Sequence, residues 1–400
     1  MKKILILGAS VFQIPIIETA KRMGLIVGIV DISSSAAAIQ YADDFFQCSL
    51  KDFEGLYKIA ERFLPDGVVI GACDTSVVAA AHICEKYGLP GHSLDTAIRA
   101  TNKLEMLMAF ERHNVAHPKF QIVNRKNIDS FKMDIPYPAI SKPVDSSGSR
   151  GIYYIDNETQ LKDALHYSLM SSQSGDVLVE EYMSGPEVSV EVIVIEGVPH
   201  VLQITDKITS GQPYFFETGH SQPSSLPNDI KNKIRDLAKQ ACIAVGIQNS
   251  PAHVEIKITE NGPKMVELGA RMGGDCISTY LLNTSVKGIS LTEATIRMAL
   301  GEKINHISYE DSGKAVAVRF ILAQEGTILS ITGIDDALKT KGAIYVHLTG
   351  KVGQNYAQTA DNASRIGYVV AEAKTTKEAL AICEEGINKI VIKYKEAEVE

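Results

Sequence analysis

Several features that mark zinc-binding, membrane or nucleic-acid-binding proteins are absent from this sequence. The six cysteines form no C-x-x-C pair and no metal-binding spacing, which is typical of a reducing compartment. No stretch approaches the ~20 apolar residues that a membrane-spanning helix needs. The formal net charge of −8 argues against nucleic acid as the main partner. We therefore expect a globular cytoplasmic protein without a membrane or nucleic-acid partner.

Two nucleotide-binding motifs are also missing. The first apolar run ends at Gly8, as in a dinucleotide-binding unit, but Ser10 and Gln13 stand where the G-x-G-x-x-G fingerprint needs glycines, so NAD binding is not expected. The segment 145–151, DSSGSRG, lacks the G-x-x-x-x-G-K-[ST] pattern of a P-loop. Because the run before Gly8 has only the length of a strand, we interpret it as a first β-strand and not as a signal peptide.

The length of 400 residues exceeds one comfortable core, so two or three domains are expected. Residues 1–92 alternate strand-like and helix-like segments, which is typical of a parallel, doubly wound α/β domain. The carboxyl ends of its strands are either a ligand-binding edge or simple tight turns. We expect strands at 3–8, 25–31 and 67–72 and helices at 11–23, 52–63 and 75–87. The carboxyl ends of the strands are then at 8–13, Asp31 and 72–75.

The remaining chain has an α+β pattern. Residues 93–113 carry helix signals, with Ser93 and Thr101 as candidate N-caps. From about residue 119 the strands are expected to be antiparallel, with 214–223 as a polar interruption before a helix at 226–245. A β-rich tail with helices at 288–299, 333–339 and 376–393 follows, and it could contribute a dimer surface.

The predicted site centres on the stretch HVEIKITENGPKMVELGARMGGD, whose Asn-Gly step between alternating apolar runs is a strong hairpin signal. A three-residue loop with Gly262 at positive φ would set Thr259 opposite Pro263. Glu255 would then lie opposite Glu267, and two such carboxylates on one face suit Mg²⁺ shared with phosphate. A two-residue loop would send the glutamates to opposite faces and leave both merely solvated.

Further side chains are candidates for nucleotide contacts. Lys103 begins a helix, where the dipole disfavours a cation, so it is either close to an anion such as phosphate or simply exposed. Lys142 precedes the 145–151 loop, which could close over phosphates or be only a linker. Main-chain groups around Glu181 to Met183 could read adenine, with Glu187 reaching the ribose hydroxyls.

Arg271 follows the hairpin in a turn bracketed by Gly269, Gly273 and Gly274. Backbone amides and a guanidinium in such a turn could face an anion together.

Three other positions are candidates for substrate contacts. Glu217 and His220 lie in the polar interruption at 214–223. They are either substrate contacts or ordinary loop residues. Arg319 shares a strand face with Ala315 and Ala317 by the period of two, and it points either toward the cleft or to solvent.

Together these residues resemble the ATP-grasp superfamily over nearly the whole chain. The resemblance rests on Lys103, Lys142 and the motifs DSSGSRG, VEEYMSGPE and VEIKITENGPKMVELGAR. It implies an α/β and α+β multidomain ATP-grasp fold. The implied parts are a Rossmann-like pre-ATP-grasp domain at 1–92, an ATP-grasp domain at 93–305 with a lid at about 118–183, and a C-terminal antiparallel β subdomain at 306–400.

The resemblance also implies roles for single residues. The implied nucleotide contacts are Lys103 and Lys142 to the phosphates of ATP, Ser147 and Gly148 in the covering loop, Glu180, Glu181, Tyr182 and Met183 around adenine, and Glu187 at ribose. Glu255 and Glu267 would bind Mg²⁺ or Mn²⁺. Many members carry Asn where this chain has Gly269, so the number of metal ions stays open. The implied catalytic and substrate residues are Arg271, Lys142, Glu217, His220, Gly273 and Gly274, with Arg319 in a segment that looks like the acceptor segment of biotin carboxylase.

Within the superfamily, the motifs GLPG, TNKLEM, ETGH, ELGARMGGD and RIGYVVAEAKT are most similar to carboxylate–amine ligases of the L-amino-acid ligase, or dipeptide synthetase, type. This implies a homodimeric, ADP-forming ligase that joins small carboxylate and amine substrates through an acyl phosphate. ATP-dependent carboxylases have the same order of motifs and stay open as an alternative, as does a nucleotide-binding module without catalysis. The motifs do not identify the two substrates.

Overall fold

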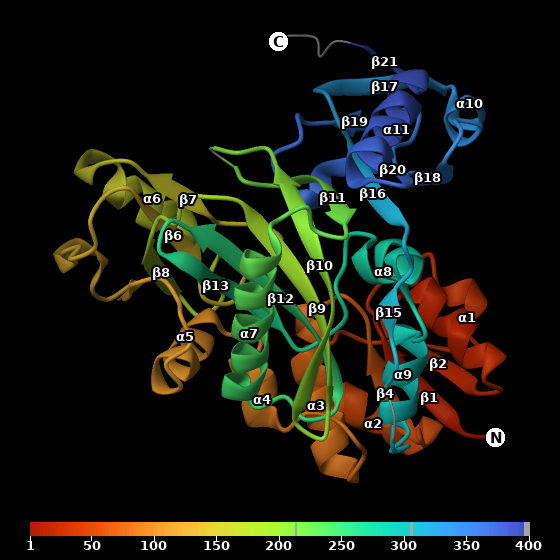
Figure 1. The fold of residues 1–400 in the computed structure, drawn as a ribbon. Coiled ribbons are helices and arrows are strands. Elements are labelled where there is room, and N and C mark those ends of the chain that lie inside the picture. The colour runs from red at the N-terminus through yellow and green to blue at the C-terminus, as the bar shows by residue number, and fades with distance from the viewer. Residues whose placement is uncertain (213, 305–306, 396–400) are drawn as a thin grey trace.

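The computed structural model describes residues 1–212, 214–304 and 307–395. Figure 1 shows an N-terminal α/β unit, a long antiparallel sheet through the middle of the molecule, a small β-sheet unit at one side, and C-terminal elements packed at one end of the long sheet. The expected combination of a parallel N-terminal sheet with antiparallel sheets is confirmed.

The N-terminal sheet is parallel, with strand order β3-β2-β1-β4. The central strand β1 is buried on both faces, since Leu5 and Leu7 pack into one apolar cluster and Ile4 and Ile6 into another. Strand β3 was missed because four half-exposed residues show no clear period. The elements are β1 Lys3–Leu7, α1 Ile14–Arg22, β2 Ile26–Asp31, β3 Asp44–Gln47, α2 Phe53–Phe63, β4 Gly67–Ile70 and α3 Asp74–Tyr87.

Two short helices, α4 Leu94–Arg99 and α5 Lys103–Arg112, lead out of this unit. Ser93 caps α4 as expected. The expectation that Thr101 caps α5 is wrong, because the Asn102 side chain accepts from two amides of the first turn.

A four-stranded antiparallel sheet has the strand order β5-β8-β6-β7. The segment 145–151, called the Gly/Ser loop below, lies between β6 and β7. Helix α6 packs on it, and an apolar cluster that includes Val123, Ala139 and Leu165 fills the space between them. The elements are β5 Phe120–Asn124, β6 Ala139–Pro143, β7 Tyr153–Ile155, α6 Glu158–Ser171 and β8 Asp176–Glu181.

The long sheet has eight antiparallel strands in the order β13-β12-β9-β10-β11-β16-β20-β18. Its strands come from both the middle and the tail of the chain, so the β-rich tail extends the hairpin's own sheet. Helix α7 Asn228–Val245 packs against β10 and β13. The strands are β9 Glu187–Ile195, β10 Val198–Thr209, β11 Glu217–Gln222, β12 Ser250–Thr259, β13 Gly262–Gly269, β16 Ala315–Leu322, β18 Ala343–Leu348 and β20 Arg365–Ala373.

Strand β11 corrects the expectation of a polar interruption at 214–223. Its last residue, Gln222, is buried because its side chain finds partners inside the protein. Gln222 Nε2 donates to Thr205 Oγ1 over 2.7 Å, and Gln222 Oε1 accepts from Ser285 Oγ over 2.7 Å. These hydrogen bonds outweigh the polar composition that suggested a loop.

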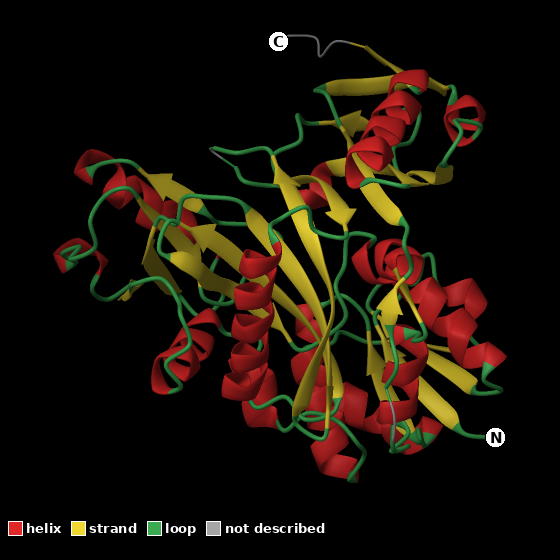
Figure 2. Ribbon diagram, in the orientation of Figure 1, coloured by secondary structure: helices red, strands yellow, loops and turns green. Residues whose placement is uncertain are grey.

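Short elements complete the fold (Figure 2). None of the helices among the described residues is long and apolar enough to cross a bilayer. The remaining elements are 3₁₀ helices at Val11–Gln13, Ile39–Tyr41, Ile128–Ser130 and Asn362–Ser364, a π-helix at Ile277–Leu281, α8 Leu282–Ser285, β14 Val286–Lys287, α9 Leu291–Ala299, β15 Glu310–Asp311, β17 Gly326–Thr332, α10 Ile334–Leu338, β19 Asn355–Tyr356, α11 Thr376–Lys389 and β21 Val391–Lys395.

Candidate active site

The hairpin of β12 and β13 turns one residue earlier than expected. Thr259 pairs with Gly262, so the turn holds two residues, and the expected pairing of Thr259 with Pro263 is wrong. Gly262 has a φ of +103°, as expected for the glycine of this turn.

The glutamate pairing is nevertheless the expected one. The short turn alone would place Glu255 opposite Val266. The register shifts between Glu255 and Ile256, which leaves Val266 as an extra residue on β13 and sets Glu255 opposite Glu267. A β-bulge therefore corrects the register and brings both carboxylates to the same cavity.

A cavity of about 450 Å³ lies between the N-terminal unit, the Gly/Ser loop and the long sheet. Its lining includes most of the candidate residues. Glu180, Glu181, Tyr182, Met183, Gly273 and Arg319 are not among the described residues that line it. Those that do are Lys103, Lys142, Ser147, Gly148, Glu187, Glu217, His220, Glu255, Glu267, Arg271 and Gly274.

Both candidate phosphate-binding lysines are buried and paired with carboxylates. Lys103 Nζ lies 3.2 Å from Glu267 Oε1 and donates to Ser146 O over 2.6 Å. Burial opposes its charge, but Glu267 and then Asp74 raise the pKa of Lys103 above its ordinary value. Lys142 Nζ lies 2.8 Å from Glu180 Oε2. The cation at the start of α5 is thus stabilised by a carboxylate and stands beside the Gly/Ser loop.

In the segment that is expected to bind adenine, two main-chain amides already donate hydrogen bonds within the protein. The Glu181 amide donates to Lys119 O over 3.0 Å, and the Tyr182 amide donates to Pro138 O over 3.2 Å. The Glu181 side chain is paired with Lys264. Within this segment, the amide of Met183 remains the candidate main-chain donor to adenine.

Lys207 on β10 is a site residue that the sequence reasoning missed. Its ammonium lies 2.7 Å from Glu187, 2.9 Å from Glu255 and 3.0 Å from Glu217, with 3% of the side chain exposed. Burial opposes the charge, but Glu187, Glu255 and Glu217 together raise its pKa well above the ordinary value. No clear signal for this role is present in the sequence, because Lys207 lies in a strand that also carries other polar residues, among them Gln203 and Asp206.

The same contacts keep Glu255 ionised. Burial favours the neutral acid, but Lys207 and His253 hold the pKa of Glu255 well below its ordinary value. Glu255 and Glu267 lie at facing positions of the bulged hairpin and offer only oxygen atoms as ligands. Such a pair suits Mg²⁺ or Mn²⁺. Gly269 adds no side-chain ligand.

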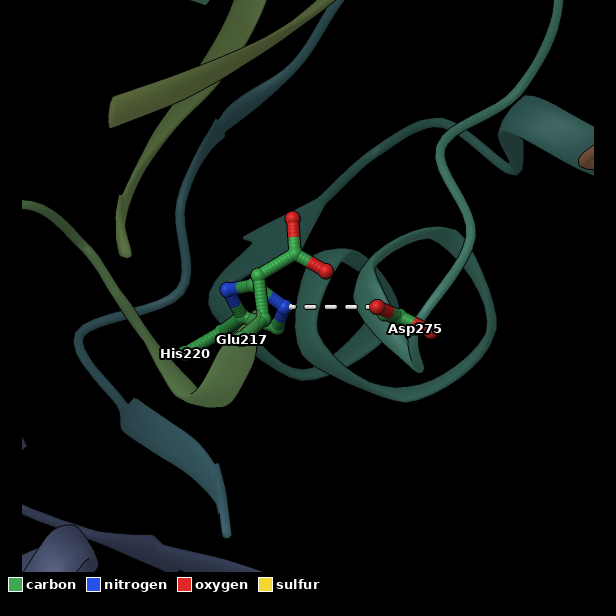
Figure 3. Close-up of side chains that lie close together, drawn as sticks. All are labelled: Glu217, His220 and Asp275. Atoms are coloured by element: carbon green, nitrogen blue, oxygen red, sulfur yellow. Dashed lines mark ion pairs between the residues drawn. The ribbon is translucent and has the colours of Figure 1, made fainter. Parts of the chain in front are cut away.

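Glu217, His220 and Asp275 form an acceptor cluster in the cavity (Figure 3). One ligand atom from each of the three lies within 4.8 Å of the others. His220 is 1% exposed, and neither of its ring nitrogens has a hydrogen-bond partner among the described residues. Its Nε2 lies 3.9 Å from Asp275 Oδ2. Three acceptors that face one another, a buried imidazole and two half-buried carboxylates, can hold a cation.

The charges around this cluster are unequal. Burial, and less strongly Asp275, raise the pKa of Glu217 to about 7 although Lys207 opposes the shift. Burial also opposes the ionisation of Asp275, but His220 and Arg365 hold its pKa well below the ordinary value. Burial lowers the pKa of His220, so this imidazole is neutral and has a lone pair to offer.

Arg365 takes the place that was expected for Arg319. Arg319 does share a face with Ala315 and Ala317, but α11 covers this face, and Arg319 Nε lies 3.9 Å from Glu384 on that helix. The expectation that Arg319 reaches the cleft is therefore wrong. Arg365 on β20 instead donates to Asp275 Oδ1 over 2.7 Å, with its guanidinium stacked on Phe320.

A buried ionic network lies behind the glutamate pair. Glu191 is fully buried on β9, with its Oε1 2.5 Å from His253 Nδ1, while its Oε2 accepts from the amide of Gly273 over 3.2 Å. A Cβ at position 273 would lie 2.6 Å from Glu191 Oε1, so only glycine fits there. His253 Nε2 lies 3.3 Å from Glu255. The network therefore links the glutamate pair to the turn after the hairpin.

Comparison with known proteins agrees with this geometry. Residues 135–279 match the family model of the ATP-grasp domain, and residues 319–395 match that of the L-amino acid ligase C-terminal domain 2. The chain is 28% identical to alanine–anticapsin ligase of Bacillus subtilis over 55% of this chain and 51% of that protein. It is 26% identical to carnosine synthase 1 of Gallus gallus over 75% of this chain and 35% of that protein. The chain thus spans about a third to a half of the length of these relatives.

Among solved structures, an L-amino acid ligase from Bacillus licheniformis superposes with a TM-score of 0.86 at 22% identity, over 99% of each chain. This likeness shows that the two chains share a fold. The chain therefore contains an ATP-grasp domain at residues 135–279 and an L-amino acid ligase C-terminal domain at residues 319–395, and its relatives include the ligase named above.

Proposed function

We propose that this enzyme joins the carboxylate of one amino acid or similar small acid to the amine of a second, through an acyl phosphate and with release of ADP and phosphate. The observation that carries the proposal is the cluster of Glu217, His220 and Asp275 in one cavity with the buried lysines and the glutamate pair. A primary ammonium has three N–H donors, and the cluster offers three acceptors. Bicarbonate, the substrate of the carboxylase alternative, is an anion that needs donors instead.

The nucleotide is assigned to the side of the cavity that holds Lys103 and Lys142. Both are buried cations, and Lys103 contacts the Gly/Ser loop directly, so phosphates bound there would be enclosed by that loop. Glu187 is assigned to the ribose hydroxyls and Met183 to adenine. Glu187 now pairs with Lys207 and Lys257, at 2.7 and 3.2 Å, so the ribose would compete with these lysines.

Glu255 and Glu267 are the residues that would hold Mg²⁺ or Mn²⁺. When bound, the metal would neutralise the negative charge of the phosphates. The chain's own part is to keep these carboxylates ionised and on one face, through Lys207, Lys103 and the bulge at Val266.

The reaction then follows from the charges in the cavity. A carboxylate oxygen of the first substrate attacks the γ-phosphorus of ATP, and ADP leaves, with Arg271 neutralising charge on the transferring group. The second substrate enters as an ammonium ion at the acceptor cluster and loses one proton there, to Glu217. Its nitrogen attacks the acyl carbon, the bond from that carbon to the phosphate oxygen breaks, and the nitrogen loses its second proton to the departing phosphate as the amide forms. Closure of the 145–151 loop keeps water from the acyl phosphate.

We also propose that the enzyme is a cytoplasmic homodimer whose contact involves the C-terminal strands. The support is a group of large apolar side chains that lie exposed in this region, among them Leu329, Leu338 and Val352 at 53%, 49% and 62% exposure. Light scattering should give twice the 43.5 kDa chain mass. The monomer mass, at concentrations used for activity, would overturn this assignment.

The decisive experiment supplies ATP, Mg²⁺, candidate amino acids and hydroxylamine. Hydroxamate together with ADP and phosphate is expected, whereas AMP and pyrophosphate would mean adenylation and would refute the mechanism. Stimulation by bicarbonate alone would favour a carboxylase. Arg271→Ala should keep nucleotide binding but lower hydroxamate formation by roughly 10²–10³-fold, as for one lost charge-stabilising donor. The matched control is Arg297→Ala, which removes a surface arginine paired with Glu293.

A further inference from the structure

Arg271 is held by a residue of the N-terminal unit. Its Nε donates to Asp74 Oδ1 over 2.8 Å, and its Nη1 donates to the carbonyl oxygen of Met272 over 3.2 Å. Among the described residues, Nη2 has no hydrogen-bond partner, and the side chain lines the cavity. Two bonds from different nitrogens thus fix the guanidinium plane and leave donors for an anion.

Asp74 is placed for this contact by its own helix. It is the first residue of α3, directly after the turn that follows β4, and its N-cap residue Cys73 makes no side-chain cap bond. A carboxylate in the first helical turn is favoured by the helix dipole. Burial opposes ionisation, but Arg271, followed by Lys103, lowers the pKa of Asp74 below its ordinary value. The contact is therefore an ion pair between two segments 197 residues apart in sequence.

Gly269 makes room for this arrangement. A Cβ at this position would lie 3.2 Å from both Cζ and Nε of Arg271, which is tighter than ordinary contact. An asparagine there would extend toward the space that the guanidinium occupies. The two units also approach closely beside the pair, since a Cβ at Gly274 would lie 3.2 Å from Cβ of Ala72.

We propose that Asp74 is a positioning residue that orients the Arg271 guanidinium toward the cavity, so that the N-terminal unit contributes to catalysis by holding this arginine in place. The inference rests on the proposed function, which gives Arg271 its charge-stabilising role. Without Asp74 the arginine stays in the site but can rotate about its side-chain bonds. When a charge-stabilising donor is no longer held in place, the rate of the chemical step falls, whereas the affinity for the nucleotide stays unchanged.

The test compares Asp74→Asn, Arg271→Lys and the double variant in the full-length protein. Asp74→Asn should lower kcat for hydroxamate formation by roughly 10–10²-fold, with an unchanged Kd for ATP and an unchanged melting temperature. The double variant should be no slower than Arg271→Lys alone, because Asp74 acts only through the arginine. The matched control is Asp43→Asn, an aspartate of the same unit that is paired with Lys21 at 3.1 Å on the surface.

Three outcomes would overturn the inference. The first is an unchanged kcat in Asp74→Asn, and the second is two single effects that multiply in the double variant. The third is a melting temperature that falls well below that of Asp43→Asn while kcat recovers on cooling, which would mean that Asp74 only docks the two units. If Arg271→Lys itself leaves the rate unchanged, the proposed role of Arg271 fails, whatever Asp74 does.

Discussion

Glu255 and Glu267 are cross-strand partners although the turn between their strands is one residue too short for that pairing. The bulge at Val266 supplies the missing residue. Bulges near active sites commonly re-aim side chains in this way. The pairing is therefore built into the strand and does not depend on the loop.

Replacing Glu267 by Gln should abolish Mg²⁺-dependent turnover and leave the fold intact. The variant keeps the size of the side chain but loses the charge that a divalent ion needs. Titration with Mn²⁺ followed by electron paramagnetic resonance should show weaker binding, and the melting temperature should stay close to that of the unchanged protein. Glu260→Gln, in the exposed turn of the same hairpin, is the matched control and should bind Mn²⁺ normally. Full Mn²⁺ affinity in Glu267→Gln would contradict the metal assignment.

Local patterns predicted those parts of the fold that depend on neighbouring residues. The three N-terminal strands, the cap at Ser93 and the positive φ of Gly262 follow from apolar periodicity, capping chemistry and turn chemistry. The pairing of Glu255 with Glu267 was predicted correctly for a wrong reason, since a bulge has no clear mark in the sequence.

Residues whose role depends on distant partners could not be predicted in this way. Lys207, Asp275 and Arg365 enter the site from separate strands and turns, and only the folded sheet shows that they meet Glu217. Strand β11 resembled a loop because the partners of its polar side chains lie far away in the chain. Arg319 was assigned to the correct strand face, but the sequence did not show that α11 covers that face.

The loop at 145–151 should become ordered when nucleotide binds. Gly148 and Ser149 both have positive φ, and a Cβ at Gly148 would meet no atom within 4 Å, so the loop has little packing of its own at this point. Hydrogen exchange of its amides should slow with ATP. Equal exchange in both states would argue against a covering role.

Lys142→Ala should raise the dissociation constant for ATP. The change removes a buried cation assigned to phosphate, and it also leaves the Glu180 carboxylate without its partner at 2.8 Å. Isothermal titration would measure the affinity. Lys162→Ala, in the exposed pair with Asp129 in the same region, is the control and should bind ATP normally.

Glu191→Ala should lower the free energy of unfolding by about 3–5 kcal/mol, because removal of this partner leaves a buried charge only partly compensated. That charge is on His253: burial opposes it, but Glu191 and then Glu255 raise the pKa of His253 to about 9. Urea denaturation measures the loss, and Glu325→Ala, at an exposed position, is the control. A loss below about 1 kcal/mol, the scale of an exposed ion pair, would mean that the network contributes little to stability.

The rate with limiting amine should rise as the pH increases through about 7, because Glu217 then loses its proton. The groups that face Glu217 are Lys207 on β10, His220 on β11, Glu255 on β12, Asp275 after the hairpin, Arg365 on β20 and Asn362. Below this pH Glu217 is neutral and can neither attract an ammonium ion nor accept its proton.

The measurement is kcat/KM for the amine from about pH 5.5 to 8.5, with two amines of different pKa. If Glu217 causes the step, its midpoint is the same for both amines and the step disappears in Glu217→Gln. A midpoint that moves with the amine would mean that the substrate's own ionisation is observed. His220 should add no step near its ordinary pKa, because burial lowers that pKa and the ring stays neutral in this range. ATP binding is the internal control and should change little across the step. Lys103 and Lys142 do not contact Glu217 among the described ion pairs.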